Sequence, residues 1–123
     1  MYRVLLVEDS RLLTDRLRET LGALDGVELV AAVADESSAV EAAASGKPID
    51  AIILDLQLKQ GTGFGVVERL GRQRPTIIVF TNYVLPEYQR RAADLGIEYF
   101  LNKSRDYERL PQLIQELEQR RQA

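Results

Sequence analysis

The sequence contains neither cysteine nor histidine. Without cysteine there is no disulfide framework and no thiolate metal site, so nothing in the chain requires an oxidising compartment. Without histidine, a Ser/His catalytic triad, an imidazole general base and histidine metal ligands are all excluded. Carboxylates, hydroxyl groups and lysine are the side chains that remain for chemistry.

Long apolar runs are also missing. The first run, 4–7, meets Glu8 after only four residues, which is too short for the apolar core of a signal peptide or for a membrane span. The net charge of −3 has the wrong sign for a surface that binds nucleic acid through its phosphates. We therefore expect a cytoplasmic protein that binds neither nucleic acid directly nor a membrane.

What is present is the composition of an ordinary globular domain. The 123 residues are 46% hydrophobic and 28% charged, enough for a full core without disulfides or structural metals. We expect a single domain over 1–123. Because the sequence stops soon after Leu117, we expect no room for a DNA-binding domain, and the chain is then either a stand-alone domain or a piece of a longer protein.

Five short apolar runs alternate with five helical patterns, which predicts βα units around a parallel sheet with right-handed crossovers. The expected strands are 4–7, 27–34, 49–55, 76–80 and 97–101, and the expected helices are 13–24, 39–44, 64–70, 86–95 and 110–117. Asp9 or Ser10 can cap the first helix, 35–37 supply cap oxygens for the second, and Pro86 suits the first turn of the fourth.

The third run ends in Asp55, after apolar residues that show no polar alternation. Such a run is typical of a strand buried on both faces of a parallel sheet. In open α/β sheets, ligands and chemistry gather just outside the carboxyl ends of the strands. A lone Asp at this position would more often be a turn former or a helix cap, so its neighbours decide how it is interpreted.

Other strands also end in polar groups. Glu8 and Asp9 follow the first strand, Thr81 the fourth and Lys103 the fifth. Each has an ordinary explanation as a cap, a turn residue or a surface charge, but together they predict one site. Three crowded carboxylates repel one another unless a cation neutralises them, and ligand sets made only of oxygen favour Mg²⁺.

A metal ion beside a carboxylate, a hydroxyl group and an ammonium group is typical of phosphoryl transfer. Asp55 is then the nucleophilic acceptor. Lys103 pairs with Asp55 before the reaction and with a phosphoryl oxygen afterwards, while Thr81 and the backbone N–H of Asn82 donate hydrogen bonds to the other oxygens.

From Val4 to Leu117 the sequence resembles the receiver domain of two-component response regulators, with the acidic pair, Asp55, the Thr and Lys103 in family order. The resemblance implies a flavodoxin-like, doubly wound α/β fold with five helices and the strand order 2-1-3-4-5. It also implies that Glu8, Asp9, Asp55 and the backbone carbonyl of Gln57 hold Mg²⁺. Asp55 would take its phosphoryl group from a histidine kinase or phosphotransfer protein.

Two positions depart from the family pattern. Ser104 follows Lys103 where receivers commonly have a proline, and an ordinary trans peptide bond is expected there. Lys59 likewise stands where the family often has a proline, although 56–58 and 61–63 still resemble the family's active-site loop and the start of the helix that follows it.

The resemblance further implies a switch, in which Thr81 moves toward the phosphoryl group and an inward-turning aromatic residue fills the space behind it. Phe100, three residues before Lys103, occupies the family's switch position, and it is equally well explained as a core residue. A downstream protein partner would bind the last two helices and strand five, and a phosphorylation-dependent dimer is a further outcome. The candidates for exposure on that face are Arg90, Arg91, Tyr99, Tyr107 and Arg109.

Gln57 and Tyr83 stand two residues after Asp55 and Thr81, so they are expected to flank the path of the water that hydrolyses the acyl phosphate. Three alternatives remain at this point. A phosphatase of the haloacid-dehalogenase type needs a second Asp where Gln57 stands. An FMN-binding flavodoxin needs a phosphate loop where Glu8 and Asp9 would repel phosphate. The third is a receiver-like module that binds its partner without phosphorylation.

Overall fold

The computed structural model describes residues 1–122, in which five strands alternate with five helices. In chain order they are β1 Tyr2–Val7, α1 Arg11–Gly22, β2 Val27–Val33, α2 Glu36–Ala44, β3 Ala51–Leu54, α3 Gly63–Leu70, β4 Thr76–Thr81, α4 Pro86–Asp94, β5 Tyr99–Asn102 and α5 Arg109–Gln122. The strands form one sheet in the order β2-β1-β3-β4-β5, and every neighbouring pair is parallel. This confirms the predicted α/β class and strand order.

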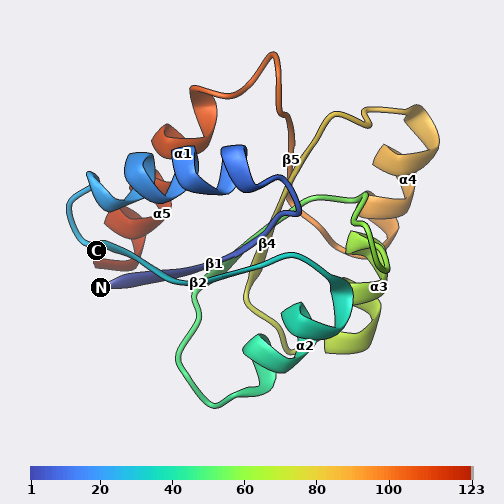
Figure 1. Ribbon diagram of the computed structural model, residues 1–123, viewed down its shortest axis with the longest axis horizontal. Coiled ribbons are helices and arrows are strands. Elements are labelled where there is room, and N and C mark those ends of the chain that lie inside the picture. Colours follow the sequence, from blue (N-terminus) through green and yellow to red (C-terminus); the bar gives the residue numbers. More distant parts are fainter. Residues whose placement is uncertain (123) are drawn as a thin grey trace.

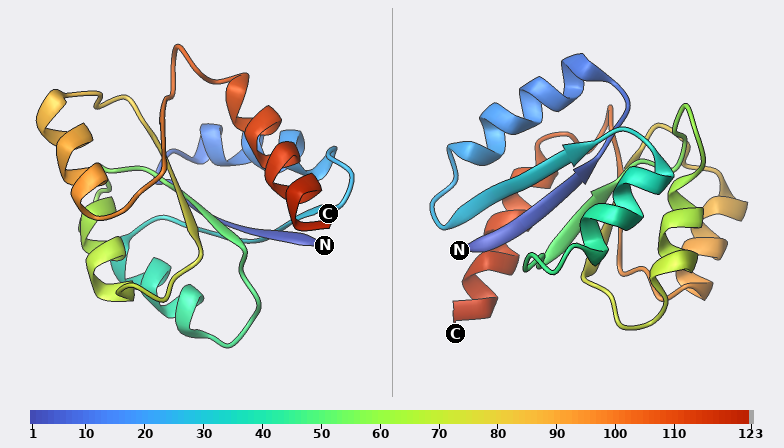
Figure 2. Two further views of the ribbon diagram at one scale, coloured as in Figure 1. Left: turned by 180° about the vertical axis from the view of Figure 1, so that it is seen from behind. Right: turned by 60° about the horizontal axis from the view of Figure 1, so that its bottom comes forward.

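The helices cover both faces of the sheet: α1 and α5 lie on one face and α2, α3 and α4 on the other (Figures 1 and 2). Each face has its own apolar core. Leu17 of α1 and Ile114 of α5 pack on the first face, whereas Val67 of α3 and Ala92 of α4 pack on the second. The central strands are covered on both sides, which explains why β3 is a continuous apolar run.

Three helices begin with the side-chain caps that their sequences favour. Ser10, Asp35 and Thr62 each accept a hydrogen bond from the backbone N–H three residues later. Because Thr62 is a cap, α3 begins at Gly63, one residue before the predicted start. By contrast, α4 follows Leu85 without any side-chain cap and has only Pro86 in its first turn.

The predicted start of the fifth strand at Ile97 was wrong. Gly96 has a φ of +77° and Ile97 donates its backbone N–H to the carbonyl oxygen of Ala92, 2.9 Å away. Both residues therefore close the end of α4, and β5 begins only at Tyr99. β3 likewise begins two residues after its predicted start, and every other strand end lies within two residues of its predicted bound.

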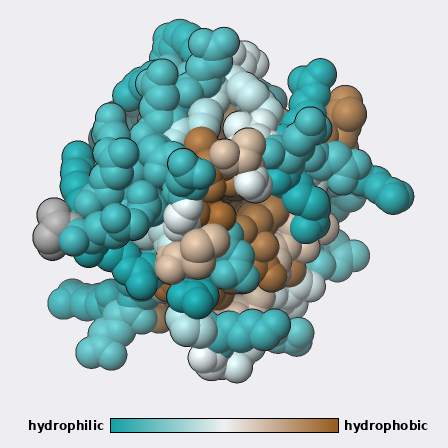
Figure 3. All heavy atoms as spheres, turned by 90° about the vertical axis from the view of Figure 1, so that its left-hand side faces the viewer, coloured by the Kyte–Doolittle hydropathy of each residue, from teal (hydrophilic) through white to brown (hydrophobic). Residues whose placement is uncertain are grey.

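β2 is an edge strand, and its side chains from Leu29 to Val33 are only partly buried. A bulge places an extra residue, Val30, between the register pairs Val4–Leu29 and Leu5–Ala31, which blunts this edge. The side of the molecule where β1 and β2 begin shows an apolar area ringed by hydrophilic residues (Figure 3). Among residues 1–122, no helix has both the length and the apolar character needed to cross a membrane.

The two leucines Leu17 and Leu12 on α1 offer a test of this packing. Leu17 is 0% exposed and Leu12 is 68% exposed. We predict that Leu17→Ala lowers the free energy of unfolding by about 2–5 kcal/mol, because it leaves a cavity under the helix. Leu12→Ala should change it by less than about 0.5 kcal/mol. Urea denaturation followed by circular dichroism measures both values, and equal losses would contradict the assigned face of α1.

Candidate functional site

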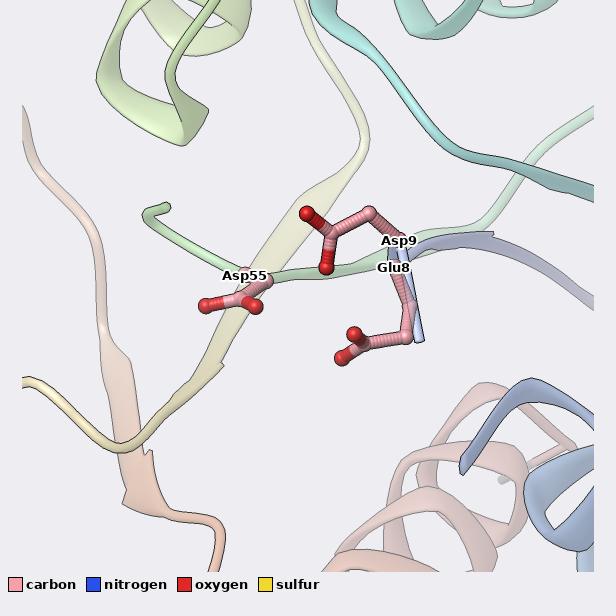
Figure 4. A group of neighbouring side chains, drawn as sticks. All are labelled: Glu8, Asp9 and Asp55. Atoms are coloured by element: carbon pink, nitrogen blue, oxygen red, sulfur yellow. The ribbon is translucent and has the colours of Figure 1, made fainter. Parts of the chain in front are cut away.

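Three carboxylates gather at the carboxyl edge of the sheet. Glu8 and Asp9 follow β1, Asp55 follows β3, and one oxygen of each lies within 4.8 Å of the others. Figure 4 shows the three side chains reaching from the two neighbouring strand ends toward a shared space. Glu8 and Asp55 are only 4% and 5% exposed, so they have little water to screen their charge, whereas Asp9 is half-buried.

Lys103 follows β5, and its ammonium group lies between two of these carboxylates. Its Nζ is 2.7 Å from Asp55 Oδ2 and 2.6 Å from Glu8 Oε1. The Lys103 backbone N–H donates to the carbonyl oxygen of Thr81, 2.9 Å away, so β4 fixes where the lysine leaves the sheet. Since all three charged side chains are largely buried, solvent and salt screen this contact less than a surface ion pair.

The burial of these groups changes their acidity. Burial raises the pKa of the Glu8 carboxyl, although hydrogen bonds from Lys103 and from the Ser10 N–H oppose the rise. For Lys103, burial alone would lower the pKa, but its hydrogen bonds to Asp55 and Glu8 outweigh that effect and the pKa is raised overall. Lys103 is therefore a permanent cation near neutral pH, and one cation cannot balance three carboxylates.

The donor set fits a hard divalent cation. All three side chains offer oxygen atoms, which suit Mg²⁺ or Mn²⁺ better than metals that favour nitrogen or sulfur. The carboxylates also line an open pocket of about 370 Å³ together with Asn82 and Lys103. An ion that keeps several waters can therefore enter from solvent and compensate the excess negative charge.

Gln57 and Tyr83 line the same pocket, Gln57 from the loop after β3 and Tyr83 from the loop after β4. The Gln57 backbone N–H donates to Asp55 Oδ1, 3.3 Å away, while its side chain is exposed. Tyr83 is 42% exposed. Both residues therefore lie beside the open pocket that contains Asp55.

Thr81 and Phe100 do not line this pocket. Thr81 is fully buried, and its hydroxyl oxygen accepts the backbone N–H of Tyr83, 3.2 Å away. Phe100 is partly buried against the core under α4. In the β4–β5 register Val79 faces Phe100 and Thr81 faces Asn102, so Thr81 and Phe100 lie on the same face of the sheet.

The loop after Lys103 is shaped by polar groups that the sequence interpretation did not identify. Asn102 Oδ1 accepts the backbone N–H groups of Ser104 and Arg105, and Asp106 Oδ2 accepts the N–H of Asn102. As expected for Ser104, the peptide bonds of the described residues are all trans. The pair of Asn and Asp four residues apart was the available signal, because such side chains commonly bond to nearby backbone groups.

Comparisons with known proteins agree with this geometry. A family model described as the response regulator receiver domain matches residues 4–115. The sensory transduction protein LytT of Bacillus anthracis is 28% identical over 125 residues, and the match covers 100% of this chain but 50% of that protein. The chain thus spans about half the length of the curated relatives that it matches.

Solved structures show the same fold at lower identity. The response regulator domain of Thermotoga maritima CheB has a TM-score of 0.83 at 20% identity, covering 98% of this chain and 95% of that one. The Mn²⁺-bound form of the response regulator Rcp1 has a TM-score of 0.77 at 24% identity, covering 96% and 92%. With the family model matching most of its length, the chain belongs to the response regulator receiver domains, the phosphoacceptor modules of two-component signalling, which are not turnover enzymes.

Proposed function

We propose that this chain is one cytoplasmic receiver domain over 1–123 that accepts a phosphoryl group on Asp55 and then changes a surface that a downstream protein partner binds. The family implies a histidine kinase as donor, directly or through a phosphotransfer protein. One observation carries the proposal: the buried Asp55 carboxylate is held by Lys103 beside Glu8 and Asp9, in a pocket open to solvent.

Receiver domains bind a divalent metal at this acidic pocket. We propose Mg²⁺ here, held by Glu8, Asp9, Asp55 and the backbone carbonyl of Gln57. The oxygen-only donor set supports this choice, as does the Mn²⁺ bound to Rcp1, an ion with similar ligand preferences. When bound, the ion supplies positive charge that neutralises the carboxylates and the phosphoryl oxygens.

In the proposed reaction an Asp55 oxygen attacks the phosphorus atom of a phosphohistidine. A new O–P bond forms as the N–P bond breaks, and the imidazole leaves with its electron pair. Lys103, which neutralises Asp55 beforehand, then pairs with a phosphoryl oxygen, and the Asn82 N–H donates to another. Thr81 joins them only after its hydroxyl turns toward the pocket, because it does not line the pocket in the present structure.

The shared face of β4 and β5 supports Thr81 and Phe100 as the switch pair. Movement of Thr81 opens space on the side where Phe100 packs, and Phe100 can turn inward. The partner would then bind α4, β5 and α5, where Arg90, Arg91 and Arg109 are exposed while Tyr99 and Tyr107 are half-buried. A cavity of about 370 Å³ between β5 and α5, lined in part by Tyr99 and Arg109, belongs to this surface.

The acceptor residue can be tested directly. We predict that the parent protein, incubated with Mg²⁺ and acetyl phosphate, gains the mass of one phosphoryl group, because the pocket brings a metal and an ammonium group to Asp55. Asp55→Asn, which keeps the size of the side chain but loses the nucleophilic charge, should gain none. Intact-mass spectrometry measures both, and an unmodified parent protein would refute the proposal.

Lys103 and the metal should partly substitute for one another. Lys103→Met leaves Glu8 and Asp55 without their buried cation, so without metal it should lower the free energy of unfolding by about 1–3 kcal/mol. Because Mg²⁺ then neutralises the same carboxylates, adding it should raise the Tm of Lys103→Met more than that of the parent. Thermal unfolding with EDTA or with Mg²⁺ gives both shifts, and an equal rise in the two proteins would argue against a shared site.

Tyr83 should affect only the loss of the phosphoryl group. We predict that Tyr83→Ala changes the lifetime of the acyl phosphate several-fold without preventing phosphorylation, because the ring flanks the water path but contacts neither Asp55 nor Lys103 through a hydrogen bond. Loss of phosphate over time by intact mass measures the lifetime, with Tyr88→Ala, a tyrosine on α4 outside this pocket, as the control. Identical lifetimes in Tyr83→Ala and the parent would contradict this role.

A further inference from the structure

Glu36, the first residue of α2, holds the loop between β3 and α3. Its side-chain Oε1 accepts the backbone N–H of Thr62, 3.0 Å away, and its own backbone N–H donates to the carbonyl oxygen of Gln60, 3.2 Å away. Arg69 of α3 donates to Glu36 Oε2 at 3.3 Å. These bonds lower the pKa of Glu36, first through the Thr62 N–H, so the carboxylate stays ionised.

Two glycines make room for this carboxylate. A Cβ atom at Gly61 or at Gly65 would overlap the Glu36 side chain. Gly61 also has a φ of +84°, a conformation that side-chain-bearing residues rarely adopt, whereas Gly65 lies within α3 at an ordinary φ. Glycine at positions 61 and 65 therefore leaves space for the carboxylate of Glu36, which belongs to α2.

The loop that Glu36 holds carries Gln57. The Thr62 end of the loop pairs with Gln57 in an isolated antiparallel bridge, and the Gly63 N–H donates to the Leu56 carbonyl oxygen, 3.0 Å away. Fixing Thr62 thus constrains the backbone at Leu56 and Gln57. We infer that Glu36 is a positioning residue that orients the Gln57 carbonyl toward the divalent cation, an inference that rests on the proposed metal site.

Mg²⁺ affinity is the measurement that tests this role. The chain has no tryptophan to report binding, so the readout is a Mg²⁺ titration of the backbone amide signals by NMR. We expect Glu36→Ala to weaken Mg²⁺ binding by at least about threefold, since groups that support metal ligands commonly affect affinity by more than this. Without metal, the Thr62 amide should exchange its hydrogen faster than in the parent.

Two further substitutions separate position from charge. Glu36→Gln keeps an oxygen that can accept the Thr62 N–H, so it should bind Mg²⁺ within about twofold of the parent. Glu41→Ala removes the same charge from an exposed position on α2 and should leave the affinity unchanged. If both weaken binding as much as Glu36→Ala does, the effect is one of net charge and the inference fails.

Gly65→Ala displaces the carboxylate without deleting it, and it covers the case in which Glu36→Ala fails to fold. Alanine favours the helix more than glycine, but its Cβ should push Glu36 off Thr62 and weaken Mg²⁺ binding to a similar degree. The double variant should then be no weaker than Glu36→Ala alone. If Glu36→Ala and Gly65→Ala both bind Mg²⁺ as tightly as the parent, the role of Glu36 is refuted while the metal site stands. If the parent itself binds no Mg²⁺, the proposed metal site is refuted as well.

Discussion

One buried lysine holds the charge balance on which the site depends. Lys103 follows β5, yet its ammonium group contacts carboxylates at the ends of both β1 and β3, so one side chain ties together segments far apart in the chain. Two buried carboxylates this close would otherwise favour protonation of one of them. The lysine offsets part of their negative charge, and the charge that remains on three carboxylates is what makes the pocket attractive to a cation.

The loops around Lys103 and the carboxylates are each held in a different way. Ser10 caps α1 directly after the acidic pair, and Asn102 and Asp106 hold the segment around Lys103 by accepting the backbone N–H groups of Ser104 and Asn102. The β3–α3 loop is held from outside, by Glu36 of α2. Ser104 and Lys59, the two positions that depart from the family pattern, lie in these loops. Hydrogen bonds set the shape of both loops, so neither loop needs a proline to hold its conformation.

Sequence patterns could predict the order of elements and the edge where the polar groups gather, because both follow from local periodicity and from the direction of parallel strands. Sequence patterns could not predict contacts between distant elements, because such contacts leave no signal in the local sequence. In the sequence Glu36 looks like any acidic residue in a first helical turn, and only the structure shows that Gly61 and Gly65 leave space for its side chain. Ile97 was placed in a strand because it is apolar and β-branched, whereas its backbone N–H completes the end of α4. Whether Phe100 moves depends on its packing energy in two conformations, which a single sequence does not determine.

The start of α4 differs from the starts of α1, α2 and α3 in having no side chain to bond its first backbone N–H groups. Reshaping the stretch from Tyr83 to Leu85 therefore breaks fewer bonds than reshaping a capped helix start would. Thr81 leads directly into this stretch. In the proposed switch, a rotation at Thr81 would therefore act on the first turn of α4 through this uncapped junction, where phosphorylation of Asp55 would be passed on as the displacement of a helix.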